Sequence, residues 1–322
     1  MERLKWIDLL RGFCMIAILW FHTEMYYVGF DKTPYAFYVG DVLAVFFIIS
    51  GYLFYQADTN KRLKSILRYI LLPYFIFTSV IAIAKYFVYQ DRNIGSLVID
   101  IISGHASWFI AALIVSQLIF IFFLRITKEK IIYLSILSIL CLVLSYFVGN
   151  SYHPSPLYYQ QNLWHFNESL LGCFLLFIGY SYHKYEAIFN RINTITYRFI
   201  LLIIVCIIKY YMIYYDDMQF IFGPIIVSNY FLFIIDLLLT GLLLIHLFKT
   251  LPSIKIIKWT GSHSIAYYFI CGGVPMIISK VLYQMNMISQ SYLAILCVFI
   301  MVYAVSTSIT WLIYRYTPIF RK

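Results

Sequence analysis

Charged residues are scarce in this chain: aspartate, glutamate, lysine and arginine together make up 12% of its 322 residues. Soluble domains carry roughly 25% charged residues and about 45–50% apolar ones, whereas 63% of this chain is hydrophobic. The composition therefore excludes an ordinary soluble domain.

The sequence also lacks the spacings that metal sites and disulfide frameworks require. Its six cysteines all lie inside apolar runs, and no two of them form a CxxC pair. We predict that they pack in the core rather than form disulfides or bind metal. The seven histidines show no two-ligand spacing on one helix, so no metal site is predicted.

Long apolar runs are abundant instead. Runs of about 20 residues, the length of a helix that crosses a ~30 Å hydrocarbon core, recur from end to end. They are continuous rather than alternating, which indicates helices rather than a membrane β-barrel. The first run lacks a small-residue cleavage site and is followed by many others, so we interpret it as a retained helix. The predicted spans are 6–28, 38–57, 66–89, 105–125, 131–149, 164–183, 197–215, 229–249, 262–282 and 291–314.

The distribution of positive charge tests this division. If the N-terminus is inside, 19 of the 24 lysine and arginine residues fall on inner segments, which fits the positive-inside rule. The net charge of +10 thus reflects topology, and we predict no nucleic-acid partner. The predicted fold is all-α: one polytopic transmembrane domain, residues 1–322, with about ten helices, contacts to membrane lipids and both termini in the cytoplasm.

Two kinds of irregularity interrupt the spans. The run from Cys271 to Pro275 contains two glycines and a proline, and it should break or kink the ninth helix near its middle. Two outer loops, 150–162 and 216–229, are the longest, and Tyr158–Asn162 in the first carries aromatic and amide groups. These groups suit a sugar, but they equally suit an aromatic belt at the membrane interface.

Ionisable residues inside membrane spans are costly and default to functional hypotheses. The first helix holds Asp8, Arg11, His22 and Glu24. Arg11 and His22 are eleven residues apart, which places them about 20° apart on one helix face and about 16 Å apart along the axis. Asp8 lies one turn before Arg11, on nearly the same stripe. A deep neutral imidazole could accept a proton, whereas the plainer alternative is that His22 only hydrogen-bonds a neighbouring helix.

Several segments resemble the membrane acyltransferase-three family. Arg11, ten intervening residues and His22 resemble its first-helix signature, and Phe46-Phe47-Ile48-Ile49-Ser50-Gly51 resembles the aromatic pair and Ser-Gly of its second helix. Further resemblances lie at 61–74, in His105-Ala106-Ser107-Trp108-Phe109, at 177–180 and at 261–268. The chain departs from the common pattern at Ala44, where many members have an acidic residue, and at Cys271-Gly272, where many have a histidine.

The resemblance implies transfer of an acyl group, usually acetyl, to a hydroxyl of an envelope polysaccharide or a lipid-linked sugar. The donor would be cytoplasmic acyl-CoA, with acetyl-CoA as a substrate and no permanently bound cofactor. The location would be the bacterial inner membrane. His22 would be the general base or the acyl relay, oriented or charge-balanced by Arg11 and Asp8. Arg11 and Arg68 at the inner face would suit the donor's phosphates.

Four residues near outer span ends form a weaker set: His105, Trp108, His165 and Glu168. They are candidates for an acceptor site, although ordinary interfacial placement explains each one alone. Asp236 also lies within a span and needs a buried partner that the sequence does not identify.

Two further functions remain open at this stage. A transporter or flippase for a polysaccharide or lipid-linked sugar could also use many helices, a broken ninth helix and buried charges. The sequence shows no two-half repeat of the kind that many transporters have. A membrane scaffold in glycan assembly is the third possibility, and it would tolerate changes at Arg11 and His22.

Overall fold

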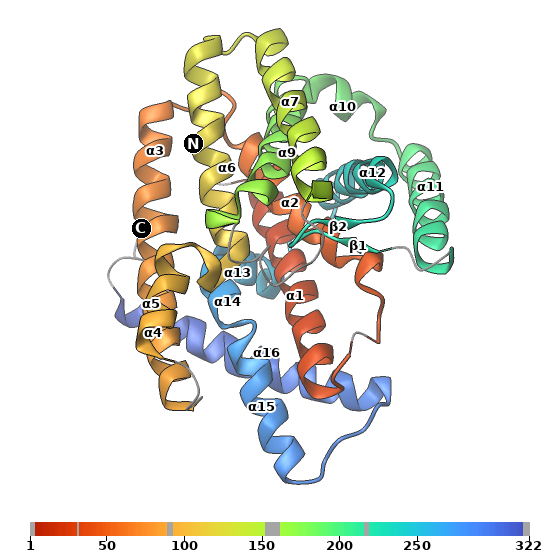
Figure 1. The fold of residues 1–322 in the computed structure, drawn as a ribbon. Coiled ribbons are helices and arrows are strands. Elements are labelled where there is room, and N and C mark those ends of the chain that lie inside the picture. Colours follow the sequence, from red (N-terminus) through yellow and green to blue (C-terminus); the bar gives the residue numbers. More distant parts are fainter. Residues whose placement is uncertain (1–3, 31, 89–92, 152–161, 216–218, 318–322) are drawn as a thin grey trace. The chain divides into compact units, whose positions relative to one another are not determined.

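The computed structural model describes residues 4–30, 32–88, 93–151, 162–215 and 219–317. These residues form two compact units, and α2 (Val39–Tyr52) begins in one and ends in the other. Unit 1 comprises residues 1–45, 193–220 and 231–322, and unit 2 comprises 46–192 and 221–230. Figure 1 traces the elements of both along the chain.

Unit 1 is built around the first helix. Its other elements are η1 (Tyr35–Phe37), α11 (Ile195–Tyr214), α12 (Tyr230–Phe248), α13 (Lys255–Ser262), α14 (Ser264–Ile270), α15 (Gly273–Gln284) and α16 (Tyr292–Tyr316). Helix α1 (Lys5–Tyr27) packs mainly against α13 and also contacts α14, α15 and α16.

Glycines allow α1 and α13 to meet backbone to backbone. A Cβ at Gly12 would overlap the Ile257 carbonyl, and a Cβ at Gly261 would overlap the Asp8 carbonyl. Each helix thus supplies a glycine exactly where the other helix's main chain passes, as small residues do in membrane interfaces. This crossing fixes how α1 lies in unit 1.

Unit 2 places α9 (Phe166–Lys184) against both α6 (Trp108–Thr127) and α7 (Ile131–Ser151). A second pair of glycines brings α2 and α9 together: a Cβ at Gly51 would overlap the Leu176 carbonyl, and one at Gly179 the Ile48 carbonyl. The remaining elements are α3 (Thr59–Ile66), η2 (Leu67–Leu71), α4 (Leu72–Val88), α5 (Ile94–Ile102), η3 (His105–Ser107), η4 (Leu163–His165) and α10 (Glu186–Ile192). Strands β1 (Phe220–Ile221) and β2 (Ile226–Val227) pair within the second long loop.

Helix α3 runs into α4 through the π-helical turn η2. Asp58 caps its start, because the carboxylate accepts hydrogen bonds from the backbone N–H groups of Asn60 and Lys61 at 2.8 and 3.2 Å. These bonds lower the pKa of Asp58. Pro73 removes the N–H that the Tyr69 carbonyl would accept from in a regular α-helix, which accounts for the loosened turn just before it.

Seven helical stretches among the described residues are long and apolar enough to cross a membrane. They are Lys5–Tyr27, Thr59–Ile83, His105–Thr127, Ile131–Gly149, Ile195–Tyr214, Tyr230–Phe248 and Tyr292–Tyr316, and the bent pair α14 and α15 makes an eighth if it is one span. Each of the ten predicted spans contains a helix. Three of those spans hold no helix that qualifies by itself: that of α2, which has only 14 residues, that of α9, and that of the bent pair α14 and α15.

The surfaces of the outer helices fit a lipid environment. Helices α7 and α11 bury only 22% of their most apolar windows within the protein. On α11, Ile195, Phe199 and Ile207 are each more than 60% exposed. So much apolar surface on three-turn or longer helices is stable in lipid but not in water. The chain is a multi-pass membrane protein.

The predicted break in the ninth helix is confirmed. Helix α14 ends at Ile270, α15 begins at Gly273, and their axes are bent by 40° (Figure 1). The short helices α5, α10 and α13 were not predicted, because seven to nine residues carry too little periodic pattern to stand out between spans.

Candidate functional site

Asp8 and Arg11 lie on the part of α1 that α13 covers. The Asp8 side chain is buried, at 5% exposed, and Arg11 is half-buried. Gly12, directly after Arg11, sits against the Ile257 backbone. The crossing with α13 therefore fixes the position of the part of α1 that carries both ionisable residues.

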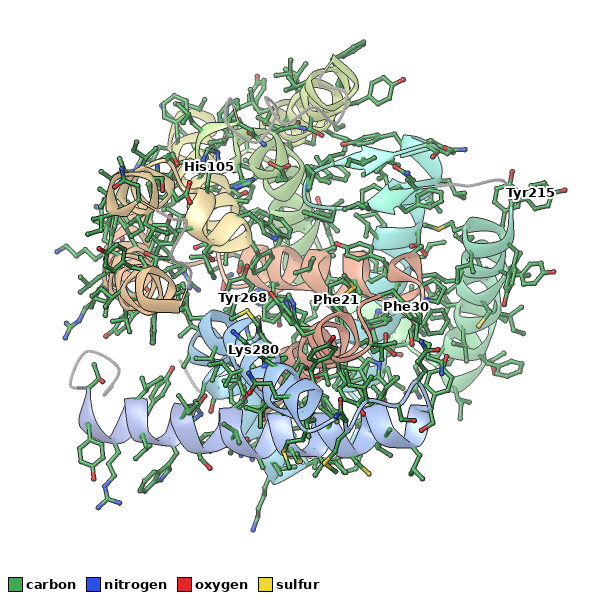
Figure 2. The ribbon with its side chains drawn as sticks, turned by 60° about the horizontal axis from the view of Figure 1, so that its bottom comes forward. Phe21, Phe30, His105, Tyr215, Tyr268 and Lys280 are labelled. Carbon is green, nitrogen blue, oxygen red and sulfur yellow. The ribbon has the colours of Figure 1, made fainter. Side chains whose placement is uncertain are left out.

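His22 lies near the other end of α1, about 16 Å along the axis from Arg11. Its imidazole is half-buried among aromatic rings. The ring centroid lies 6.2 Å from that of Tyr26 in a stacked arrangement and 5.5 Å from that of Phe21, which Figure 2 labels. Packing against these two rings therefore holds the plane of the imidazole.

Glu24, two residues further on, has a structural task in the same helix. Its carboxylate is fully buried and accepts hydrogen bonds from Trp20 Nε1 at 3.0 Å, from the Thr33 backbone N–H at 3.1 Å and from Thr33 Oγ1 at 2.9 Å. It thereby ties the segment after α1 back onto the helix. The ionisable residues of α1 thus fall into two groups. Asp8, Arg11 and His22 are functional candidates, whereas Glu24 anchors the segment that follows the helix.

The weaker set of four candidates comes together in unit 2. His105 starts η3 and Trp108 starts α6, while His165 ends η4 and Glu168 lies in the first turn of α9. The rings of His105 and His165 meet edge to face with centroids 5.5 Å apart, and the Trp108 ring lies 6.2 Å from that of His165. Figure 2 labels His105 where the chain enters α6.

Polar contacts hold this cluster. Glu168 is fully buried, and its Oε2 lies 3.5 Å from His165 Nδ1 and accepts a 2.7 Å hydrogen bond from Asn162 Nδ2. Nδ1 of His105 lies 2.8 Å from Ser103 Oγ. The sequence did not identify Asn162 or Ser103 as partners, because each is an ordinary loop residue until the fold brings it beside a histidine.

The backbone at this cluster is unusual. Trp164 and His165 both have positive φ, at 53° and 50°, a region that residues with a Cβ rarely occupy. The Trp164 N–H donates to the Ser103 carbonyl at 2.7 Å, which links η4 to the turn before η3. The strained pair turns the chain so that His165 faces His105 at the start of α9.

Arg68 occupies the π-helical turn η2 and is exposed. Its guanidinium carbon lies 5.5 Å from the centroid of the neighbouring Tyr69 ring. Residues 158–161, which belong to the aromatic and amide stretch that suits either a sugar or an interface belt, lie outside the described residues.

A buried ion cluster in unit 1 supplies the partner that Asp236 needs. The Lys209 ammonium donates to Asp41 Oδ2 at 2.5 Å, to Asp236 Oδ2 and to the Ala36 carbonyl at 2.9 Å. All three side chains are at most 7% exposed. The sequence placed Lys209 among the few outer basic residues, but a lysine in an apolar run, with an aspartate in the next run, could have suggested the pair.

The comparisons with known proteins identify the class. The sequence model of a family described as an acyltransferase domain matches residues 4–315, almost the whole chain. The chain therefore belongs to the membrane acyltransferase-three family, and it is a membrane acyltransferase. No curated protein and no solved structure matches it significantly.

Proposed function

We propose that this acyltransferase moves an acetyl group from cytoplasmic acetyl-CoA to a hydroxyl of an envelope polysaccharide or lipid-linked sugar in the bacterial inner membrane. The observation that carries the proposal is the α1 stripe in a chain whose family match begins at residue 4 and includes the whole of that helix. Arg11 and Arg68 would each bind donor phosphate, because guanidinium groups pair with phosphate oxygens.

His22 is the proposed catalytic residue, and two routes are compatible with its position. As a general base, it takes the proton of the acceptor hydroxyl while that oxygen attacks the thioester carbonyl. The C–S bond then breaks, and the proton passes to the departing thiolate. As a relay, its nitrogen attacks the thioester carbonyl, the C–S bond breaks, and the thiolate of CoA leaves with the imidazole proton. The acceptor oxygen then attacks the acyl-imidazole, the C–N bond breaks, and the hydroxyl proton passes to the freed imidazole. Arg11 and Asp8 would orient the helix end that receives the donor and balance its charge.

The acceptor would bind at the cluster of His105, Trp108, His165 and Glu168. These residues offer two imidazoles, an indole and a carboxylate close together. Hydrogen-bonding groups beside an aromatic ring suit a sugar better than they suit an acyl chain.

The test is His22→Ala. Transfer of labelled acetyl from acetyl-CoA to envelope glycan should fall at least 100-fold. Insertion and the thermal unfolding profile should remain unchanged, because the half-buried His22 ring contributes ring contacts with Phe21 and Tyr26 on its own helix. Acetylation is measured by mass spectrometry of the isolated glycan and with purified protein in nanodiscs.

Met25→Leu is the matched control, since Met25 is 37% exposed on the same helix and should tolerate the change. Full acetylation by a well-expressed His22→Ala variant would refute the assignment. Movement of glycan across vesicles without consumption of thioester would favour a transporter instead.

A further inference from the structure

The short helix α5 has an exposed apolar face. Ile94, Val98 and Ile102 follow one another at four-residue intervals, so they lie on one side of the helix, and each is 45–65% exposed. We call these three residues the α5 face. Leu97 and Ile101 lie on an adjacent side and are buried in unit 2. So large an apolar face on a nine-residue helix is not stable in water, and an apolar partner has to cover it.

Helix α5 packs against a helix that is long enough to cross the membrane. It contacts α4 (Figure 1), and the Tyr74 hydroxyl donates to the Ile101 carbonyl at 2.8 Å. Tyr74 belongs to the apolar stretch Thr59–Ile83 and lies about 14 Å along it from Ile83. Where this stretch crosses the membrane, the last turn of α5 lies inside the lipid layer rather than at its surface.

The length of chain between the two helices determines the direction of α5. Helix α4 ends at Val88, about 21 Å beyond Tyr74 along its axis, and six residues lead from there to Ile94. Six residues span at most about 20–22 Å. Because Tyr74 holds the last turn of α5, a helix that ran straight away from α4 would need a longer connection. Helix α5 therefore runs back along α4 toward Tyr74, which is the course of a re-entrant hairpin.

The position of α6 agrees with this depth. Arg125, near the end of α6, donates to the Asn60 side chain at the start of α3 at 2.7 Å, so these two helix ends lie at about the same depth. The rise from Asn60 to Ile83 is about 34 Å, whereas the rise from Arg125 to Trp108 is about 26 Å. The chain thus enters α6 about 8 Å short of the level that Ile83 reaches.

Lipid is the partner that fits the α5 face. Val80 and Ile83 of the adjacent α4 are 59% and 60% exposed, so the neighbouring span already presents an apolar surface to lipid. The two polar residues of α5, Ser96 and Asp100, lie on the opposite side of the helix from the α5 face. We propose that α5 is a re-entrant helix, that lipid acyl chains cover the α5 face, and that the helix leads the chain to η3 at membrane depth. This placement does not depend on which group the protein transfers.

The experiment is site-directed spin labelling of the full-length protein in nanodiscs, in a background in which the exposed Cys206 and Cys297 are replaced by alanine. The labelled variants are Ile94→Cys, Val98→Cys and Ile102→Cys. Power saturation measures how often each label collides with oxygen, which concentrates in lipid, and with a water-soluble nickel complex. All three labels should collide mainly with oxygen. Their depth should increase by about 12 Å from Ile94 to Ile102, because eight residues rise about 12 Å along an upright helix.

Ile83→Cys is the lipid-facing reference, and its label should lie shallower than that of Ile102→Cys. Lys61→Cys is the water-facing reference, because Lys61 is exposed. Ile99, which is 65% exposed, replaces any position on α5 whose variant fails to elute as folded protein. Equal depths along α5 would show a helix that lies flat at the interface and would overturn the proposal. Frequent collision with the nickel complex, or exclusion of both reagents by a protein partner such as a second copy, would overturn it as well.

Discussion

At the scale of single residues, the cluster of Lys209, Asp41 and Asp236 shows how a costly group becomes tolerable. A lone ammonium in the apolar interior costs several kcal/mol, and so does a lone carboxylate. Here the three N–H donors of the ammonium reach two carboxylates and the Ala36 carbonyl. The cluster ties η1, α2, α11 and α12 of unit 1 together through one side chain.

Removing Lys209 alone should therefore lower the free energy of unfolding more than removing the charges of Lys209, Asp41 and Asp236 together. Lys209→Met leaves two buried carboxylates facing each other, and we expect a loss of about 3–5 kcal/mol in the free energy of unfolding. The triple variant Lys209→Met, Asp41→Asn, Asp236→Asn should regain most of that loss. Thermal unfolding in detergent, followed by size-exclusion chromatography, measures both.

Lys280→Met is the control for loss of one positive charge, because Lys280 lies on α15 and takes no part in this cluster. Equal melting temperatures of Lys209→Met and the unchanged protein would contradict a stabilising role of the cluster.

At the scale of elements, the two glycine pairs determine which helices touch. Gly12 with Gly261 joins α1 to α13, and Gly51 with Gly179 joins α2 to α9. All four of these glycines lie in segments that resemble the family signature: Gly12, Gly51, Gly179 and Gly261. The resembling segments thus contain the glycines at the helix crossings as well as the candidate functional residues.

A single methyl group should disturb these crossings. Gly261→Ala places a Cβ into the Asp8 carbonyl, so α13 must move away from α1, which we expect to cost about 1–3 kcal/mol and most of the acetyl transfer. Gly273→Ala is the matched control, since a Cβ there meets nothing within 4 Å. Both are measured as transfer rate and melting temperature, and equal behaviour of the two variants would disprove the packing argument.

The sequence predicted the structure best where a pattern extends over many residues, as the apolar runs do. Ten apolar runs each contain a helix, and the Gly-Gly-Val-Pro stretch does break the ninth. The first-helix stripe could also be read directly, because helix geometry alone puts Arg11 and His22 on one face. The meeting of His105 with His165 could not, since it depends on left-handed backbone at Trp164 and on a hydrogen bond to Ser103. Such contacts between segments about 60 residues apart leave no local periodic trace.

At the scale of the whole molecule, burial explains why helix α2 is shorter than a helix that crosses lipid by itself. Helix α2 has 14 residues and is about 21 Å long, yet nearly all of its side chains are buried in protein. A helix that is surrounded by other helices need not match the thickness of the lipid core. A test of length and hydropathy alone therefore passes over a short apolar helix that is buried in the protein, as it does over α2.

The topology makes a prediction for the full chain. If both termini are inside, as the distribution of basic residues predicts, a green fluorescent protein fused to the C-terminus should fluoresce, and alkaline phosphatase fused after Asn286 should be active. The same enzyme fused after Ser253, in the basic segment before α13, should be inactive, which serves as the control. Activity at Ser253 and none at Asn286 would invert the orientation.

The contact of Gly12 with the Ile257 carbonyl has a consequence for distance. Because the backbones of α1 and α13 are in direct contact there, no flexible side chain lies between them that could adjust to a shift of α1 along its axis. The ten-residue step from Gly12 to His22 then sets a distance of about 15 Å along α1 between the contact with α13 and His22. One residue inserted in this stretch would turn His22 by about 100°, and four would restore its face but shift it by about 6 Å. The ten-residue spacing thus fixes how far His22, the proposed catalytic residue, lies from the contact with α13.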